Sequence, residues 1–470
     1  MKKSLHSLAF ALALPVATAA VLKAQTAPQI PVPDQLDLKT AVGFALDNNF
    51  AIRQARERIK QQALSGARAK YLVQTQERTR PERIKQQEGV VIEVSAREIP
   101  NVAATGSYQG NSKTITSQAP ASDRFWAISL TASQVLFAGG GVRSAVKSSQ
   151  LVREAALLDL QSTINDALLQ VRTLFYNVLL AREKIKVQEQ NLELLLQQLK
   201  TTTDRYDAGT VSSFEKLRAE VSVANAKVPL ITARNDYRLA IESLRQALGF
   251  TTNREDSIRK IPDFIGTLDY TPASFDLQAA FDAAHANRPD LQRLAKLAAS
   301  REETITTAKA NYFPTVSAFG GWQLRKGSTY GFGDSNHGWL VGVQSQWNIF
   351  DGRATAGRVS QARSALEQTR LTLTEAQLAI EVEVRRAYSN WQQATELADA
   401  MTKVTGQAEE SVRLANARYS AGTATQLDLL QAQTDLTTAR TNQIQAYYTY
   451  TVAVASLRKA MGMADEFVTK

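Results

Sequence analysis

Residues 205–210 read RYDAGT and residues 418–423 read RYSAGT, so one turn-like hexapeptide recurs after 213 residues. The same offset relates LRQALG at 244–249 to LRKAMG at 457–462. A constant offset between separated motifs is the mark of an internal repeat, and a repeat decides the architecture before any local structure is considered. The sequence therefore predicts two copies of one structural plan, arranged in tandem.

The first copy is longer than the second near its start. Before the predicted strands, the offset between the copies rises from 214 to 239, which leaves 25 extra residues in the first copy. A tandem duplication accounts for them, because ERIKQQ at 57–62 recurs at 82–87. We expect the insert, over 63–87, to lengthen the first helix or to bulge it near Pro81, because proline kinks a helix.

The chain divides into a leader, two repeats and short joining segments. Residues 1–24 combine a basic start, an apolar stretch and a run of small residues, which is typical of a secretory signal peptide cleaved between 19 and 24. The predicted organisation is then repeat 1 over 25–250, a connector over 251–275, repeat 2 over 276–463 and a tail over 464–470. The signal predicts that the mature protein works outside the cytoplasm.

Each repeat contains a stretch in which apolar residues alternate with small polar ones, FWAISLTASQVLF at 125–137 and WLVGVQSQWNI at 339–349. Alternation with period two predicts strands, and a weaker partner precedes each, so we expect strand pairs over about 101–137 and about 315–350. Their length and terminal aromatic residues favour a membrane β-barrel over an ordinary half-buried hairpin. The face expected to meet lipid comprises Trp126, Ile128, Leu130, Trp339, Val341, Val343 and Trp347.

Two very long helices are predicted after each strand pair. The sequence there is rich in helix-forming residues, and rods of about 65 residues would be roughly 100 Å long. Gly209 and Gly422 are expected to end the rods. A coiled-coil spacer is the alternative, but a sustained strict heptad is missing. The helices are expected over 141–206, 213–248, 354–419 and 425–461.

The predicted strands are too few to close a barrel within one chain. An open sheet edge is not viable in lipid, and bacterial barrels begin at eight strands. A dimer would supply eight strands, which fill their own interior, whereas a trimer would supply twelve and leave room for a lumen. We therefore expect a mainly α fold with a transmembrane β-barrel portion, built from two tandem helix–strand–strand–helix–helix repeats and assembled as a homotrimer.

Composition excludes several classes of function. The 470 residues are 44% hydrophobic, carry a formal net charge of +10 and contain no cysteine, which excludes disulfides, thiol catalysis and thiolate metal sites. His6, His285 and His337 are far apart, and no spacing marks a catalytic triad. We expect no enzyme activity, no cofactor and no metal. The basic residues form no concentrated patch, so we expect no nucleic-acid partner.

One alternative to a membrane channel stays open at this point. A secreted helical scaffold or adhesin stalk, with no lumen, would also use long helical rods. Such a protein has no need of long strands with an apolar outer face, and this chain carries them twice. The repeated strand pairs therefore favour the channel.

These features together resemble the TolC-like outer-membrane efflux proteins. The resemblance rests on the duplicated halves, the strand ends LFAGG at 136–140 and IFDG at 349–352, and the repeated R-Y-x-A-G-T turn. It implies a homotrimer whose twelve-stranded barrel in the outer membrane continues as a twelve-helix tunnel across the periplasm. It also implies a passive exit duct for small molecules or proteins in a tripartite efflux or type I secretion system. The implied partners are a periplasmic adaptor (membrane fusion) protein and an inner-membrane pump of the RND, ABC or MFS type.

The resemblance further implies a gate at the periplasmic end. Tyr419 matches the family's aperture tyrosine, Asp428 matches the first aspartate of its constricting ring, and Glu215 stands at the same place in the first copy. Ala424 and Gln431 depart from the family pattern, in which an arginine and a second aspartate stand there. Three copies of Asp428 around a narrow lumen would make a negative ring that favours cations. The alternative for each of these carboxylates is that it simply lies on a solvated face of its helix. The tips expected to dock the adaptor comprise Arg205, Tyr206, Gly209, Arg418 and Gly422.

Overall fold

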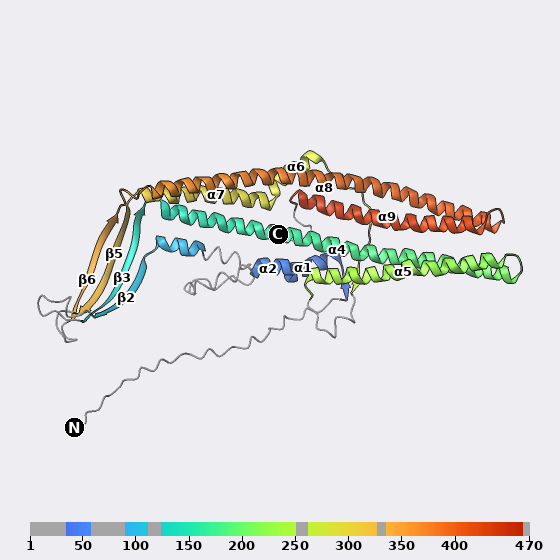
Figure 1. Cartoon of the computed structure of the whole chain (residues 1–470), viewed down its shortest axis with the longest axis horizontal. Coiled ribbons are helices and arrows are strands. Elements are labelled where there is room, and N and C mark those ends of the chain that lie inside the picture. The colour runs from blue at the N-terminus through green and yellow to red at the C-terminus, as the bar shows by residue number, and fades with distance from the viewer. Residues whose placement is uncertain (1–33, 58–89, 111–123, 251–261, 327–334, 464–470) are drawn as a thin grey trace, which may run out of the picture.

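A computed structural model of the chain describes residues 34–57, 90–110, 124–250, 262–326 and 335–463. The described chain is mainly helical, as expected, and a four-stranded sheet stands at one end of a long bundle of helices (Figure 1). The predicted signal peptide, the insert with Pro81 and the predicted tail fall outside the described residues.

The sheet is antiparallel, and each half of the chain contributes one strand pair. Its strands are β2 (Asn101–Gly110), β3 (Arg124–Ala138), β5 (Thr315–Lys326) and β6 (Ser335–Gln346), in the spatial order β2-β3-β5-β6. The two halves therefore meet through β3 and β5, while β2 and β6 form the two edges. β6 ends at Gln346, before the expected limit of 350, so Trp347 follows the strand rather than lying within it.

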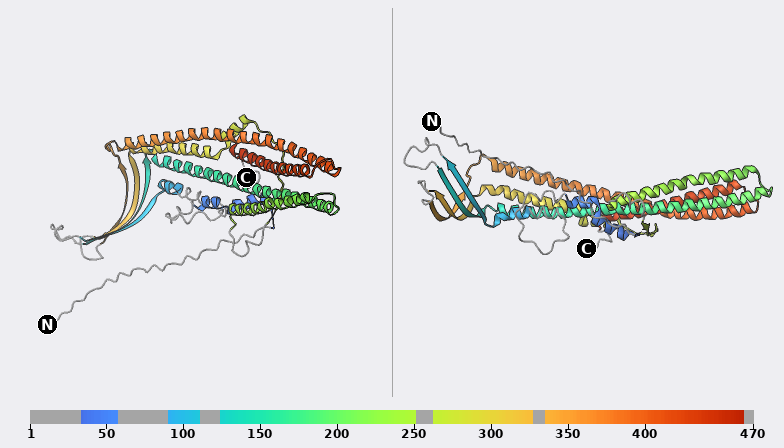
Figure 2. Two further views of the ribbon diagram at one scale, coloured as in Figure 1. Left: turned by 45° about the vertical axis from the view of Figure 1, so that its right-hand side comes forward. Right: turned by 90° about the horizontal axis from the view of Figure 1, so that it is seen from below.

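The four long helices form two hairpins. α4 (Gly141–Asp207) returns as α5 (Ser213–Leu248), and α8 (Ala354–Ser420) returns as α9 (Gln426–Ala460). α4 and α8 have 67 residues each, which makes rods of about 100 Å. Both hairpins turn at the end of the bundle farthest from the sheet, as two further views confirm (Figure 2).

The helix expected at the start of each repeat is broken in two. The first half has α1 (Leu38–Asn48) and α2 (Phe50–Glu57), and the second has α6 (Leu277–Asn287) and α7 (Pro289–Lys309). The breaks fall at matching positions, Asn49 and Arg288. The 3₁₀ turns η2 (Ala96–Glu98) and η3 (Ala310–Tyr312) lead into the sheet, and β1 (Gln35–Leu36) pairs in parallel with β4 (Asp263–Phe264).

The end of α5 packs against the break between α1 and α2, and the end of α9 packs against the break between α6 and α7. Gly249 follows α5 with φ +73°, and Gly462 follows α9 with φ +70°, conformations that favour glycine. A Cβ at Gly249 would collide with the carbonyl oxygen of Asn48, and one at Gly462 would lie 2.9 Å from the amide nitrogen of Arg288. In both halves, therefore, the backbone at the end of the return helix packs directly against the break, near the middle of the long helices.

In the second half, ion pairs reinforce this joint. Arg288 is 8% exposed, and its Nη2 lies 2.7 Å from Asp290 Oδ2 and 2.9 Å from Glu383 Oε2. Lys459 Nζ, at the end of α9, lies 2.9 Å from Asp166 Oδ1 of α4 and 3.5 Å from Glu383 Oε1. The network thus connects α4, α7, α8 and α9.

Apolar cores surround the two joints. The first contains Phe175 of α4, Ile241 of α5 and Val42 of α1, and the second contains Trp391 of α8 and Leu457 of α9. The short helices therefore pack where three segments can bury a common core. Among the described residues, no helix combines the length and apolar character needed to cross a bilayer.

Candidate functional site

The repeated R-Y-x-A-G-T motif ends the long helices by a defined hydrogen-bond pattern. The Gly209 N–H donates to the Tyr206 carbonyl (2.8 Å), and the Thr210 N–H donates to the Arg205 carbonyl (2.9 Å). The Thr210 hydroxyl donates to that same carbonyl (2.8 Å). Gly209 has φ +70° and Gly422 has φ +74°, as this helix stop requires. The motif recurs because both rods stop in the same way.

The helices that return from the tips begin on capping residues. Thr425 Oγ1 accepts from the Asp428 N–H (3.2 Å), and Asp428 Oδ2 accepts from the N–H (2.9 Å) and hydroxyl (2.8 Å) of Thr425, which is a capping box. Ser212 caps α5 by accepting from the Glu215 N–H (3.3 Å). The two bonds from Thr425, together with the nearby charge of Arg418, lower the pKa of Asp428. Asp428 is therefore an exposed carboxylate held as an anion.

The two hairpins touch each other at their tips through a tip contact, which we define as Thr202, Arg205, Tyr419 and Gln426. The Arg205 guanidinium carbon lies 5.0 Å from the centre of the Tyr419 ring. Gln426 Nε2 donates to the buried Thr202 hydroxyl (3.4 Å). Tyr419 is only 8% exposed, and its hydroxyl has no hydrogen-bond partner within the described part of the chain. The contact is thus partly buried, polar and incompletely hydrogen-bonded.

Farther from the tips, the seam between α4 and α9 is also polar. Its hydrogen bonds join Asn191 to Thr437, Gln190 to Arg440 and Lys184 to Gln445. Within the α4–α5 hairpin, by contrast, Leu195 and Val223 belong to a buried apolar cluster. Leu430 of α9 packs against this cluster, so the seam between hairpins combines apolar packing with hydrogen bonds.

The three predicted gate residues lie at the tips on three different helices: Glu215 on α5, Tyr419 on α8 and Asp428 on α9. Among the described residues, no hydrogen bond or ion pair joins them to one another. Gln431, one turn beyond Asp428, donates to Asp435 Oδ1 (2.9 Å). The resemblance did not reveal the capping role of Asp428, although Thr-x-x-Asp at 425–428 was a readable signal for it.

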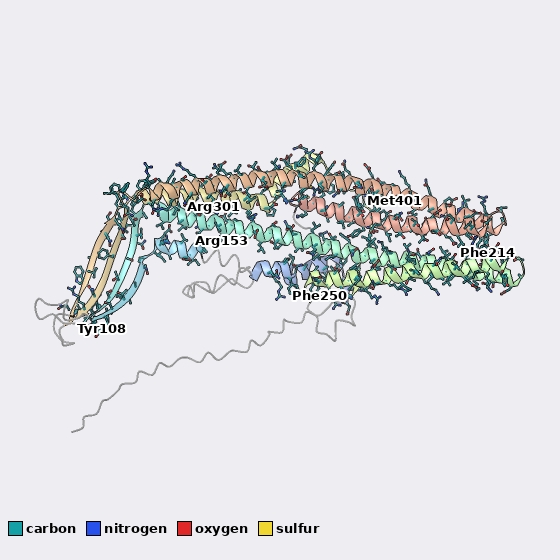
Figure 3. All side chains as sticks on the ribbon, viewed as in Figure 1. Tyr108, Arg153, Phe214, Phe250, Arg301 and Met401 are labelled. Atoms are coloured by element: carbon teal, nitrogen blue, oxygen red, sulfur yellow. The ribbon has the colours of Figure 1, made fainter. Side chains whose placement is uncertain are left out.

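The predicted docking tips are exposed turns with cation–π pairs beside them. An added Cβ would meet no atom within 4 Å at Gly209 or Gly422. Lys216 Nζ lies 5.0 Å from the centre of the exposed Tyr206 ring. Phe214, labelled near the tips in Figure 3, is exposed beneath the Arg218 guanidinium. The tips therefore offer aromatic and cationic groups to solvent.

The sheet provides a second candidate surface, because its register gathers apolar residues on one face. Leu130 of β3 lies opposite Trp322 of β5, which lies opposite Trp339 of β6. Trp339 is 78% exposed. Six of the residues expected to meet lipid share this face: Trp126, Ile128, Leu130, Trp339, Val341 and Val343. Trp347 departs from that set, because it follows β6 and its indole N–H donates to the Tyr312 carbonyl (3.1 Å).

The other face of the sheet is mostly small and polar, with Phe319 and Leu340 as its large apolar residues. The hydroxyl oxygens of Thr105 and Ser129 are 2.6 Å apart across β2 and β3. The Phe319 ring covers Gly342, where an added Cβ would lie 2.8 Å from it. A β-bulge between Val135 and Phe137 interrupts the alternation expected to continue to the end of β3. The sheet thus has one face suited to lipid and one suited to water.

The described residues show no arrangement for metal binding. No group of three or more histidine, aspartate and glutamate side chains within them could hold a metal ion. His285 Nε2 lies 3.5 Å from Glu381 Oε1 on the bundle, and His337 lies on β6 opposite Leu324. The two histidines are thus on different parts of the molecule.

Sequence comparisons identify the family to which the chain is similar. Residues 83–250 and 280–463 match the family described as outer membrane efflux protein. Outer membrane protein TolC of Escherichia coli (strain K12) is 26% identical over 310 residues, which cover 64% of this chain and 62% of TolC. Alkaline protease secretion protein AprF of Pseudomonas aeruginosa is 22% identical over 318 residues, which cover 67% of this chain and 66% of AprF.

Solved structures of outer-membrane proteins share the fold over most of this chain. The Campylobacter jejuni CmeC outer membrane channel matches with a TM-score of 0.70 at 15% identity, over 90% of this chain and 85% of that one. The outer membrane protein VceC of Vibrio cholerae matches with a TM-score of 0.69 at 15% identity, over 91% of this chain and 96% of that one. The chain therefore belongs to the outer membrane efflux protein family, which places it in the outer membrane.

Proposed function

We propose that three copies of this chain form the outer-membrane exit duct of a tripartite efflux or type I secretion system. The observation that carries the proposal is the four-stranded sheet, with one apolar face and with β2 and β6 as edges. In lipid, every backbone N–H and C=O group needs a partner, so these edges require strands from other copies. Three copies would close a twelve-stranded barrel with the apolar face outward and the polar face around a lumen.

Exposed apolar residues along the helices support the same assembly. A contiguous apolar surface exposed on one chain marks a place where another surface binds. On α5 the exposed apolar residues are Phe214, Leu217, Val221, Val228, Ile231 and Leu239. On α8 they include Leu371, Leu378 and Val382. Neighbouring copies in a twelve-helix tunnel would cover both stretches.

The tips are proposed as the gate and as the adaptor-docking site. Three exposed Asp428 carboxylates around a narrowed lumen would favour cations, with Tyr419 and Glu215 beside them. A periplasmic adaptor would dock on the turns at Arg205, Tyr206, Gly209, Arg418 and Gly422. An inner-membrane pump of the RND, ABC or MFS type would then supply the energy, because the chain has no catalytic arrangement of its own among its described residues.

Two experiments test the assembly. Purified protein is expected to conduct ions in planar bilayers. Because the chain contains no cysteine, Thr105→Cys in β2 can be paired with a single cysteine at successive positions along β6. Cross-linking between copies is expected to give covalent dimers and trimers at the positions where edges pair. A monomeric, water-soluble protein that neither conducts nor cross-links would instead support the scaffold or adhesin stalk.

A further inference from the structure

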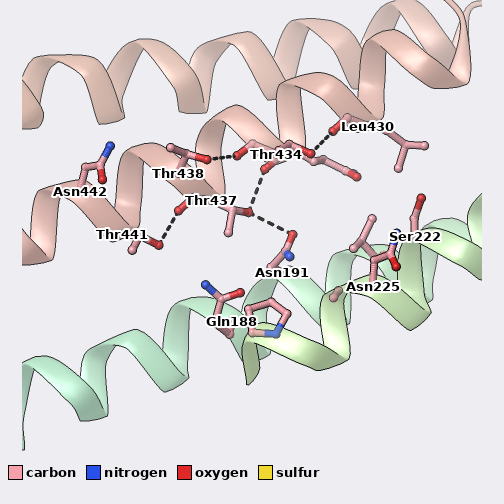
Figure 4. Close-up of a pocket in the computed structure, with 14 residues that line it drawn as sticks. Gln188, Asn191, Ser222, Asn225, Leu430, Thr434, Thr437, Thr438, Thr441 and Asn442 are labelled. Atoms are coloured by element: carbon pink, nitrogen blue, oxygen red, sulfur yellow. Dashed lines mark hydrogen bonds between the residues drawn. The ribbon is translucent and has the colours of Figure 1, made fainter. Parts of the chain in front are cut away.

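A polar groove lies where α4, α5 and α9 meet, in the half of the bundle nearer the tips (Figure 4). We define the polar groove by Gln188, Asn191, Asn225, Gln433, Thr437 and Asn442. Its volume is about 470 Å³, and no lysine, arginine, aspartate or glutamate lines it. The groove is therefore a neutral site with many hydrogen-bonding groups.

Several of these groups have no partner among the residues that the structure describes. Gln433 is 7% exposed, and its buried Oε1 accepts no hydrogen bond from any described residue. The side-chain amides of Gln188, Asn225 and Asn442 also make no hydrogen bond within the described chain, and Figure 4 places them around the opening. Pro229 lacks an N–H, so the carbonyl of Asn225 loses its helical donor. A buried amide oxygen without a partner carries a free-energy cost that a bound donor would remove.

The size and chemistry of the groove select the ligand. Sites for small ligands range from roughly 300 to 1,000 Å³, whereas a two-turn helix would need roughly 800 Å³. A charged ligand would find no counter-charge among the lining residues. Leu195, Ala226 and Pro229 give the groove apolar surface as well. The remaining class is a neutral molecule with several hydroxyl groups and C–H faces.

We propose that the polar groove binds a neutral saccharide of one or two sugar units. The Gln433 amide can turn about its broad χ3 torsion to present its oxygen to a sugar hydroxyl. The amides of Gln188, Asn225 and Asn442 can each donate to and accept from further hydroxyls. This site is separate from the tips and from the sheet, and the proposal goes beyond the proposed channel function.

The test uses the full chain purified in a zwitterionic detergent that has no sugar head group. Trehalose is the probe, and binding is followed by isothermal titration and by saturation-transfer NMR. We expect saturable binding that weakens about tenfold in Gln433→Leu, because one hydrogen bond is lost. The matched control is Gln431→Leu, which makes the same change on the same helix at a residue that hydrogen-bonds Asp435 outside the groove. The control is expected to keep its affinity within about twofold.

Three further measurements test the proposal. Gln433→Leu removes a buried oxygen without a partner, so its melting temperature is expected to equal or exceed that of the parent protein. Asn225→Ala, at the exposed rim, provides a second variant with reduced affinity. Glucuronate is expected to bind more weakly than trehalose because of its charge. Absence of saturable trehalose binding, or an equal loss in the Gln431 control, would overturn the proposal.

Discussion

Arg205 of the first half lies over the ring of Tyr419 of the second half, with 5.0 Å between the guanidinium carbon and the ring centre. Arg205 precedes the turn glycine Gly209 in the first half, and Tyr419 precedes Gly422 in the second half. The two residues therefore occupy nearly equivalent places in the repeat. This contact and the hydrogen bond from Gln426 to Thr202 therefore join one hairpin tip to the other. Its partners are a guanidinium and an aromatic ring, and within the described ranges neither residue forms an ion pair.

Replacing Arg205 by alanine is expected to loosen the tips. A cation–π pair at a partly exposed site is worth about 1 kcal/mol, which corresponds to a roughly fivefold shift between closed and open tips. The measurement is single-channel recording in planar bilayers, where the variant should spend more time in high-conductance states. Lys216→Ala is the control, because Lys216 pairs with Tyr206 inside one hairpin. Equal opening in both variants would contradict a specific role for the Arg205–Tyr419 contact.

Removing the Thr425 hydroxyl is expected to raise the pKa of Asp428. The lowered pKa of Asp428 depends first on its bond from the Thr425 N–H and next on the bond from the hydroxyl. Thr425→Ala removes the second bond and costs about 1 kcal/mol as a lost N-cap. The carboxyl can be followed by NMR titration below pH 5. Ser212→Ala, the equivalent change in the first half, should leave the titration of Asp428 unchanged.

Replacing Arg288 by alanine is expected to destabilise the joint in the second half. It would leave Asp290 and Glu383 without their buried partner, at a cost of about 3 kcal/mol in the free energy of unfolding. Thermal or urea unfolding measures the change. Arg293→Ala is the control, because Arg293 makes a single ion pair of 3.7 Å with Asp159 at the surface. That variant should change the free energy by less than about 1 kcal/mol.

The same joint predicts a response to acid. Burial acts to raise the pKa of Asp290, but the hydrogen bond and charge of Arg288 outweigh it, so the pKa lies below the usual 3.8. A carboxylate with a lowered pKa in the folded state contributes stability above pH 3.8, and this contribution is lost as the pH falls through the folded pKa. The stability difference between the parent protein and Arg288→Ala should therefore shrink below pH 3.8. A difference that stays constant down to pH 2 would contradict this account.

An arginine on the apolar face of the sheet is expected to prevent membrane assembly. Val341→Arg would place a charge toward lipid, which costs about 2 to 4 kcal/mol near the middle of a bilayer. Gln344→Arg, three residues along on the polar face, should assemble normally. The fraction of protein recovered in outer-membrane vesicles measures the outcome. Equal recovery of the two variants would contradict the assignment of the lipid face.

The long helices were predictable almost to the residue because local signals mark both ends. Gly209 and Gly422 provide the left-handed turn, and Ser212 and Thr425 provide the caps that begin the next helix. The breaks at Asn49 and Arg288 were missed, because helical periodicity continues through them. Local signals for both breaks were nevertheless present. Asn49 Oδ1 accepts from the N–H groups of Ala51 (2.8 Å) and Ile52 (3.2 Å) and so caps α2, and a proline follows Arg288.

The sheet and the tips show where sequence patterns stop being sufficient. Alternation continues to Ile349, but β6 ends at Gln346, and the indole of Trp347 instead bonds the Tyr312 carbonyl. The role of Asp428 as a cap was readable from its spacing to Thr425. The contact of Arg205 with Tyr419 was not readable, because only the folded bundle brings those two segments together.

The two edge strands described above have a genetic consequence. If every barrel needs the β2 edge of one copy and the β6 edge of the next, a chain that is damaged at one edge can still join through the other. Such a chain would occupy a place in the ring and leave the whole ring unsealed. Edge variants are therefore expected to be dominant over the intact gene, whereas variants that fail to fold are expected to be recessive.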